Sequence, residues 1–209
     1  MYSGLLKEDL LYVEKIISDI IKKTETLKFF VSFDLVTFGR NIDEILYTII
    51  KSNEQTYRLL EALKLISSAI LHGQNKKGFD LVDLKLQNLL WDKSNKVLYF
   101  IDLEHAGIHR KYWGLANIFV IHWMLISKKS TSLRILKNYL ENKQLEEIQE
   151  VLMDLRTNGI IIALYYYNGA LQDNNENRIL VLTKIIDLFL DDSEVEFSKL
   201  LNSLESSFN

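Results

Sequence analysis

The sequence predicts an α+β fold that is predominantly helical, and three observations support this prediction. Apolar residues recur at spacings of three and four over most of the chain, which is the pattern of amphipathic helices. Residues 27–39 are instead rich in β-branched and aromatic side chains, and residues 88–102 place two apolar runs around a polar turn, so both stretches favour short strands. No internal repeat or low-complexity linker divides the 209 residues, and we therefore expect a single domain over 1–209.

The composition argues against several classes of protein. Hydrophobic residues make up 48% of the chain, enough to fill a core, and the formal net charge of −3 gives no basic field that would attract nucleic acid. The absence of cysteine excludes disulfides, thiolate zinc sites and a cysteine nucleophile, and it fits a reducing compartment, with the cytoplasm as the default. No apolar run approaches the roughly 20 residues that span a bilayer, and charged residues interrupt the N-terminal pattern. We therefore expect neither a membrane span nor an export signal.

The N-terminal part is expected to contain one helix and two short strands. Residues 5–23 carry apolar side chains at helical spacing, and LKFFVSFDLVTFG, residues 27–39, predicts two strands or a hairpin that ends at Gly39. Asn41 can then cap a short helix, and residues 54–72 predict a longer one. The chain has no proline, so its turns must be built from glycine, asparagine and aspartate.

Beyond residue 112 nearly every segment has a helical period. The expected helices are 112–127, 131–141, 144–170, 176–191 and 193–206. The longest of these contains Asn158 and Gly159, at which it could break. Aromatic residues at helical spacing, including Tyr165–Tyr167, are expected in the core. The four histidines lack the HExxH spacing, so no zinc site is predicted.

A hairpin is expected between two groups of polar residues. NLLW and KVLYFID predict two short strands, and the polar turn DKSN joins them. Such a hairpin would bring Asn88 and Asp102 together, close to Asp83 in the preceding polar loop. Oxygen ligands of this kind, including one or two carboxylates, suit Mg²⁺, which takes its other ligands from water and substrate phosphate. A carboxylate that holds no metal can accept the proton of an attacking hydroxyl, and a lysine two residues on can face a phosphate.

The order DLKLQN, hairpin, IDLEHAG resembles the catalytic loop and the metal-binding loop of the protein-kinase-like superfamily. DLKLQN matches the DLKxxN of protein kinases, whereas IDLEHAG is more similar to the IDFE segment of choline kinases and aminoglycoside phosphotransferases. Similarity extends outward on both sides. FDLVTFGRNIDEIL resembles the strand, hinge and helix that support the adenine in these kinases, and YWGLANIFVIHWML resembles their first helix after the metal loop.

The resemblance implies a protein-kinase-like C-terminal lobe with a reduced N-terminal part. Residues 1–39 would be a remnant small lobe and hinge, made of one helix and two short strands, and residues 40–209 would be the helical large lobe. The implied activity is the transfer of the γ-phosphate of Mg-ATP to a hydroxyl acceptor. Asp83 would correspond to the catalytic base and Lys85 to the γ-phosphate contact.

The cofactors that the resemblance implies are Mg²⁺ and ATP. Asn88 and Asp102 would correspond to the metal ligands, with Glu104 as an auxiliary metal carboxylate. Val36 and Phe38, in the hinge segment, would contact the nucleotide.

Several positions depart from the family pattern. Leu81 and Val82 stand where protein kinases have the histidine and arginine of HRD, and Gly114 stands where the superfamily often has an aspartate that anchors the catalytic loop. Both departures remove a brace from that loop. Upstream, the sequence has no glycine-rich phosphate loop, and no lysine in an apolar strand is available to pair with Glu14, the candidate for the family's helix glutamate.

These departures leave other functions open. A chain that keeps the Asp, Lys, Asn, Asp set without a nucleotide lid could be a degenerate enzyme, or a pseudokinase or protein-interaction module without catalytic activity. A protein partner or a second copy would then cover the face where a small lobe normally lies. A helical scaffold with coincidental motifs is the third alternative. The acceptor also stays open, because IDLE favours a small-molecule, sugar or lipopolysaccharide-core substrate whereas DLKLQN favours a protein.

Overall fold

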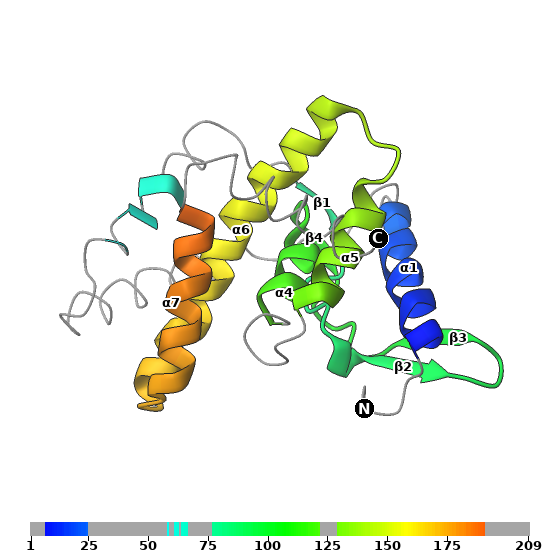
Figure 1. Ribbon diagram of the computed structural model, residues 1–209, viewed down its shortest axis with the longest axis horizontal. Coiled ribbons are helices and arrows are strands. Elements are labelled where there is room, and N and C mark those ends of the chain that lie inside the picture. The colour runs from blue at the N-terminus through cyan, green and yellow to red at the C-terminus, as the bar shows by residue number, and fades with distance from the viewer. Residues whose placement is uncertain are drawn as a thin grey trace.

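The computed structural model describes residues 7–24, 58, 61–62, 64–66, 77–121 and 129–190. Helices make up most of this part of the chain (Figure 1). They are α1 (Lys7–Thr24), α4 (Trp113–Ile121), α5 (Lys129–Leu140), α6 (Leu145–Gln172) and α7 (Glu176–Leu190). Residues 58, 61–62 and 64–66, within the predicted helix 54–72, are also helical. The predicted α+β, predominantly helical class is confirmed.

Two small antiparallel sheets complete the described part. The strands are β1 (Lys77–Asp80), β2 (Leu89–Asp92), β3 (Val97–Phe100) and β4 (Gly107–Arg110). β2 pairs with β3, which is the hairpin predicted from NLLW and KVLYFID, and β1 pairs with β4. The second pair was not predicted, because KGFD and GIHR hold too few β-branched or aromatic residues to stand out from the surrounding loops.

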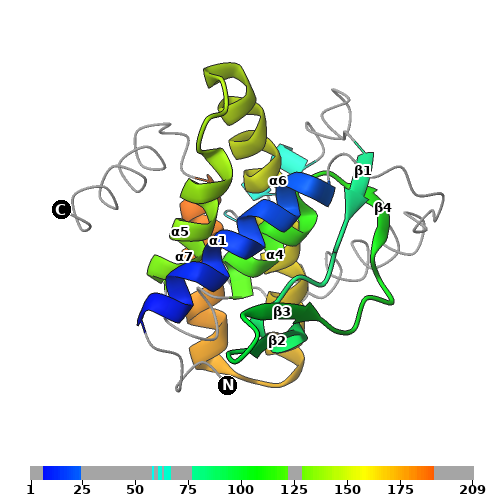
Figure 2. The same ribbon diagram turned by 90° about the vertical axis from the view of Figure 1, so that its right-hand side faces the viewer.

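The core lies where the helices meet. α6 packs along α7 and against α4, and α5 packs against both α1 and α4 (Figure 2). Every residue of α4, WGLANIFVI, is buried, as expected of a helix that has no polar face. α4 therefore forms the centre of the helical body.

α1 contributes to this same core. Val13, Ile17 and Ile21 repeat every four residues and are buried in one cluster with residues of α4 to α7. Glu14 is fully buried, and Arg134 of α5 donates two hydrogen bonds of 2.5 Å to its carboxylate. The sequence suggested Glu14 as the family's helix glutamate with no strand lysine available to pair with it, and its partner in the structure is an arginine of the helical body.

α6 runs from Leu145 to Gln172 without the break considered at Asn158 and Gly159. Asn158 accepts a hydrogen bond from Arg110 and donates one to the Lys111 carbonyl, both at 2.8 Å, so its side chain does not compete with the helix backbone. A Cβ at Gly159 would overlap the ring of Phe189 in α7. The glycine is therefore required by the close approach of α6 and α7.

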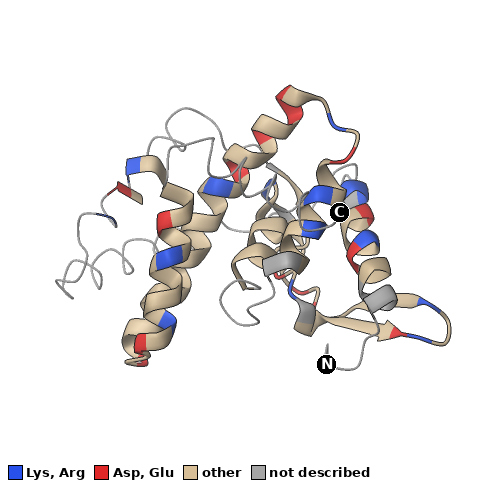
Figure 3. Ribbon diagram, in the orientation of Figure 1, with Lys and Arg blue, Asp and Glu red and all other residues tan. Residues whose placement is uncertain are grey.

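In Figure 3 charged residues of both signs lie along α1 and α7, whereas those of α6 lie in its N-terminal half, between Glu146 and Arg156. None of the helices that the structure describes is long and apolar enough to cross a membrane. The predictions for residues 27–39, including Val36 and Phe38, and for the helix 193–206 lie outside the described residues. The division into a remnant small lobe over 1–39 and a large lobe over 40–209 stays a prediction for the same reason.

Candidate functional site

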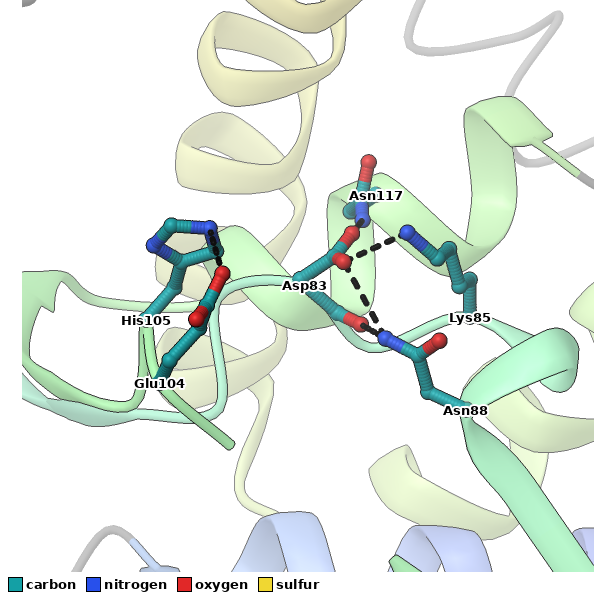
Figure 4. A network of polar contacts seen from close by, with 6 residues as sticks. All are labelled: Asp83, Lys85, Asn88, Glu104, His105 and Asn117. Atoms are coloured by element: carbon teal, nitrogen blue, oxygen red, sulfur yellow. Dashed lines mark hydrogen bonds and ion pairs between the residues drawn. The ribbon is translucent and has the colours of Figure 1, made fainter. Parts of the chain in front are cut away.

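The candidate site is built on the loop between β1 and β2. Asp83 lies at its centre, and its Oδ2 accepts hydrogen bonds from Lys85 Nζ at 2.5 Å and from Asn88 Nδ2 at 3.1 Å (Figure 4). A short 3-10 helix, Leu86–Asn88, turns the chain so that Asn88 returns beneath Asp83. The loop thus brings together three of the residues singled out in the sequence.

The orientation of Asn88 follows from its hydrogen bonds. Its Nδ2 donates both to the Asp83 carboxylate and to the Asp83 backbone carbonyl, each at 3.1 Å. Because both bonds use the amide nitrogen, the amide oxygen is directed away from Asp83, as Figure 4 shows. Asn88 therefore presents an oxygen on the side opposite to the candidate base.

The hairpin brings Asp102 next to Asn88. The Ile101 N–H donates to the Asn88 carbonyl at 2.9 Å, which extends the β2–β3 pairing by one step beyond Leu89 and Phe100. Asp102 follows directly and is exposed. The hairpin therefore brings the backbones of these two candidate metal ligands side by side, as the sequence predicts.

Two residues of the site have left-handed backbone conformations. Val82, just before Asp83, has φ 52°, and Asp102 has φ 60°. This conformation is a genuine outlier for a β-branched residue such as valine. It persists only where surrounding contacts hold it, and such residues cluster at functional sites.

Glu104 is directed toward a different partner. Its carboxylate lies 3.3 Å from His105 Nε2, and both side chains are exposed (Figure 4). Over the described ranges, no three His, Cys, Asp or Glu side chains gather closely enough to hold a metal ion. A Mg²⁺ site here would therefore depend on Asn88 and Asp102, and the auxiliary role of Glu104 stays a prediction.

Two helices add residues that the sequence analysis did not include in the site. Asn117 of α4 is 6% exposed, and its Nδ2 lies 3.4 Å from Asp83 Oδ1. An isolated asparagine in an apolar helix was the available signal, because a buried amide needs a hydrogen-bonding partner.

Tyr166 of α6 is the second addition. Burial, followed by the nearby charge of Asp83, raises the pKa of Tyr166 to about 12. The phenol is protonated at neutral pH, as that of an unshifted tyrosine would be, and the shift keeps it protonated further into the alkaline range. Of the tyrosine run expected in the core, Tyr167 is buried, Tyr166 is half-buried and packs against the core, and Tyr165 is exposed; the prediction was wrong only for Tyr165.

The hairpin carries an exposed apolar face beside the polar site. Val97 and Tyr99 lie on one face of β3, Leu90 of β2 lies opposite Tyr99, and Ile101 and Leu103 follow the end of β3. The exposed side chains are Leu90, Val97, Tyr99, Ile101 and Leu103, each 39% to 52% exposed. We call these five residues the hairpin face.

The structure is similar to solved kinases, although no protein-family model and no curated protein matches the sequence. An ethanolamine kinase from Plasmodium vivax is 15% identical, with a TM-score of 0.58 over 87% of this chain. A choline/ethanolamine kinase family protein from Mesorhizobium loti is 14% identical, with a TM-score of 0.56 over 96% of this chain. The chain has a protein-kinase-like fold.

The kinase-like fold confirms what the two motifs suggested about architecture. This chain spans 61% of the Plasmodium protein and 68% of the Mesorhizobium protein. Within the fold, DLKLQN forms the loop around Asp83 and IDLEHAG follows the hairpin, in the order that the resemblance implied.

Proposed function

We propose that this chain is a kinase-like phosphotransferase that moves the γ-phosphate of Mg-ATP to a hydroxyl acceptor. The observation that carries the proposal is the environment of Asp83. Lys85, Asn88 and Asn117 surround its carboxylate within a kinase-like fold, and Asp102 follows the residue paired with Asn88. This set supplies a base, a cation and oxygen ligands, which phosphoryl transfer requires.

In the proposed mechanism Asp83 is the general base. Its Oδ2 accepts bonds from Lys85 and Asn88, whereas Oδ1 has the longer contact of 3.4 Å to Asn117. Oδ1 is therefore the oxygen that accepts the acceptor's hydroxyl proton. The acceptor oxygen then bonds to the γ-phosphorus as the bond from phosphorus to the β–γ bridging oxygen breaks and ADP leaves.

Lys85 has a second role in this scheme. An ammonium group has three N–H donors, so Lys85 can keep its bond to Asp83 and also bind the γ-phosphate. The contact would fix the phosphate relative to the base and neutralise part of its charge.

The donor set fits Mg²⁺. The amide oxygen of Asn88 and the exposed carboxylate of Asp102 would hold the ion, and a single carboxylate is sufficient because Mg²⁺ keeps several waters and phosphate oxygens. When bound, Mg²⁺ would neutralise the charge that develops on the phosphates. Beside these ligands, the hairpin face offers apolar surface for the adenine base, together with the predicted contacts from Val36 and Phe38.

The proposal is tested by calorimetric titration of ATP with and without Mg²⁺. We expect binding that requires Mg²⁺ in the wild type and that is lost in Asp102→Ala. Asp92→Ala is the matched control, because Asp92 lies in the same hairpin but caps its turn by accepting bonds from the Ser94 and Asn95 amides. Folded wild-type protein that binds no Mg-ATP would sink the proposal. Binding would justify a screen of alcohol, sugar and protein acceptors.

The hairpin face supports a second candidate, a pseudokinase or protein-interaction module. Five large apolar side chains exposed together are unusual on a surface that binds nothing. For this candidate, Tyr99→Lys should abolish self-association or partner binding measured by analytical ultracentrifugation, while the wild type should bind no nucleotide. Mg-dependent nucleotide binding would favour the phosphotransferase instead.

A further inference from the structure

A second carboxylate lies just before the candidate base. Asp80, the last residue of β1, is 8% exposed, and its Oδ1 accepts hydrogen bonds from the backbone N–H groups of Val82 and Gly114, both at 2.7 Å. The first bond closes a tight local turn. The second reaches across 34 residues to the N-terminus of α4, where backbone N–H groups have no partner within the helix.

Gly114 is the residue that permits this approach. A Cβ at this position would lie 2.7 Å from Asp80 Oδ1 and 3.2 Å from the Leu84 Cβ. Its backbone φ is not in the left-handed region, so the requirement is for space and not for conformational freedom. Any larger residue at 114 would displace the Asp80 carboxylate.

A parallel contact lies one turn further along α4. Asn117 is three residues beyond Gly114, and it contacts Asp83, which is three residues beyond Asp80. Residues three apart lie on the same face of a helix, so one face of α4 holds the loop at two points. Between these points Val82 has its strained left-handed conformation, which the bond from its N–H to Asp80 helps to maintain.

We propose that Asp80 is a positioning residue that fixes the Asp83 loop to α4, and that Gly114 is the space it requires. The glycine at 114 was interpreted from the sequence as a lost brace. In the structure a carboxylate joins the loop to the helix at that same point, but the loop supplies the carboxylate and the helix supplies the N–H. Asp80 touches no reacting group in this scheme and acts through the placement of Asp83. The contact between Asp80 and α4 does not depend on the proposed function; only its expected effect on catalysis rests on it.

Amide hydrogen exchange measured by NMR tests the brace without reference to activity. In Asp80→Ala we expect the amides of Val82 and Gly114 to exchange about tenfold faster or more, because each loses a bond to a charged acceptor. Gly114→Ala should have a similar effect on Val82, since the added Cβ displaces Asp80. The double variant should exchange no faster than either single variant, because both changes remove one contact.

Two further variants sharpen the test. Asp92→Ala removes a carboxylate that also accepts two backbone N–H bonds, so it should speed exchange at Ser94 and Asn95 while leaving Val82 and Gly114 unchanged. Asp80→Asn keeps an oxygen acceptor of the same size and should restore most of the protection, which covers the case in which Asp80→Ala does not fold. Unchanged exchange in both Asp80 variants, or additive effects in the double variant, would overturn the brace.

Kinetics then separate a positioning role from a purely structural one. Asp80→Ala should lower kcat for phosphotransfer about tenfold or more and change KM for ATP much less, because the hairpin pairing holds the proposed Mg²⁺ ligands Asn88 and Asp102, and Lys85 is the one proposed phosphate contact in the displaced loop. Equal kcat in wild type and variant, despite faster exchange, would overturn the positioning role. Wild-type protein that neither binds nor turns over Mg-ATP would instead overturn the proposed function, while the exchange data would still decide whether the brace exists.

Discussion

The side-chain amide of Asn117, on the buried helix α4, donates to the Oδ1 atom of Asp83 across 3.4 Å. This contact orients the oxygen that we assign as proton acceptor. Asn117→Leu keeps the approximate volume but removes the donor, so we expect kcat for phosphotransfer to fall about tenfold to a hundredfold while KM for ATP changes little.

The control for this variant is Asn95→Ala. Asn95 also donates its amide to a carboxylate, Asp92 Oδ2 at 2.8 Å, but in the exposed hairpin turn. It should leave kcat unchanged. A loss of activity as large in Asn95→Ala as in Asn117→Leu would contradict the assigned role of Asn117.

The buried pair of Glu14 and Arg134 should be a major source of stability. Removing Arg134 leaves the fully buried Glu14 carboxylate without its ion-pair partner, so Arg134→Met should lower the free energy of unfolding by about 3–5 kcal/mol. The double variant Glu14→Leu/Arg134→Met should recover most of this loss, because both charges are then absent. Urea denaturation measures all three free energies.

An exposed ion pair serves as the comparison. Arg58 lies 3.4 Å from Asp187, and the two side chains are 54% and 43% exposed, so Arg58→Met should have little effect on stability. If Arg134→Met costs no more than Arg58→Met, α1 is not fixed to α5 in solution as the structure indicates.

His109 should make stability depend on pH. It is 3% exposed, and burial, followed by the charge of Arg110, lowers the pKa of His109 from 6.5 to about 4. Between these values the unfolded chain binds a proton that the folded chain does not. The contribution of the neutral His109 to the free energy of unfolding is therefore complete above about pH 6.5. It is lost as the pH falls toward 4, and the total loss is up to about 3 kcal/mol.

The measurement is the free energy of unfolding in urea at several pH values across that window. His109→Gln should give a shallower slope than the wild type. Identical slopes for wild type and His109→Gln would show that His109 is not buried in its neutral form.

The contacts that the sequence predicted are those made within a few residues. Asn88 and Asp83 are five positions apart, and the hairpin that brings Asp102 beside Asn88 needs only one short turn. Local turn chemistry and strand patterning were sufficient for these. The pairing of Glu14 with Arg134 spans 120 positions, and the bond from Gly114 to Asp80 spans 34. Such contacts depend on how helices pack, and hydrophobic periodicity gives the buried face of a helix but not its partner.

The two glycines of α6, Gly159 and Gly169, have different surroundings, so the same glycine-to-alanine substitution should have opposite effects at the two positions. A Cβ at Gly159 would overlap the Phe189 ring, so Gly159→Ala must push α7 away and should destabilise the protein by about 1–3 kcal/mol. Gly169 has nothing within 4 Å of an added Cβ, and Gly169→Ala should stabilise the helix by up to about 1 kcal/mol. Thermal unfolding should therefore shift in opposite directions for the two variants. A shift in the same direction for both would mean that α6 and α7 are not in close contact at Gly159.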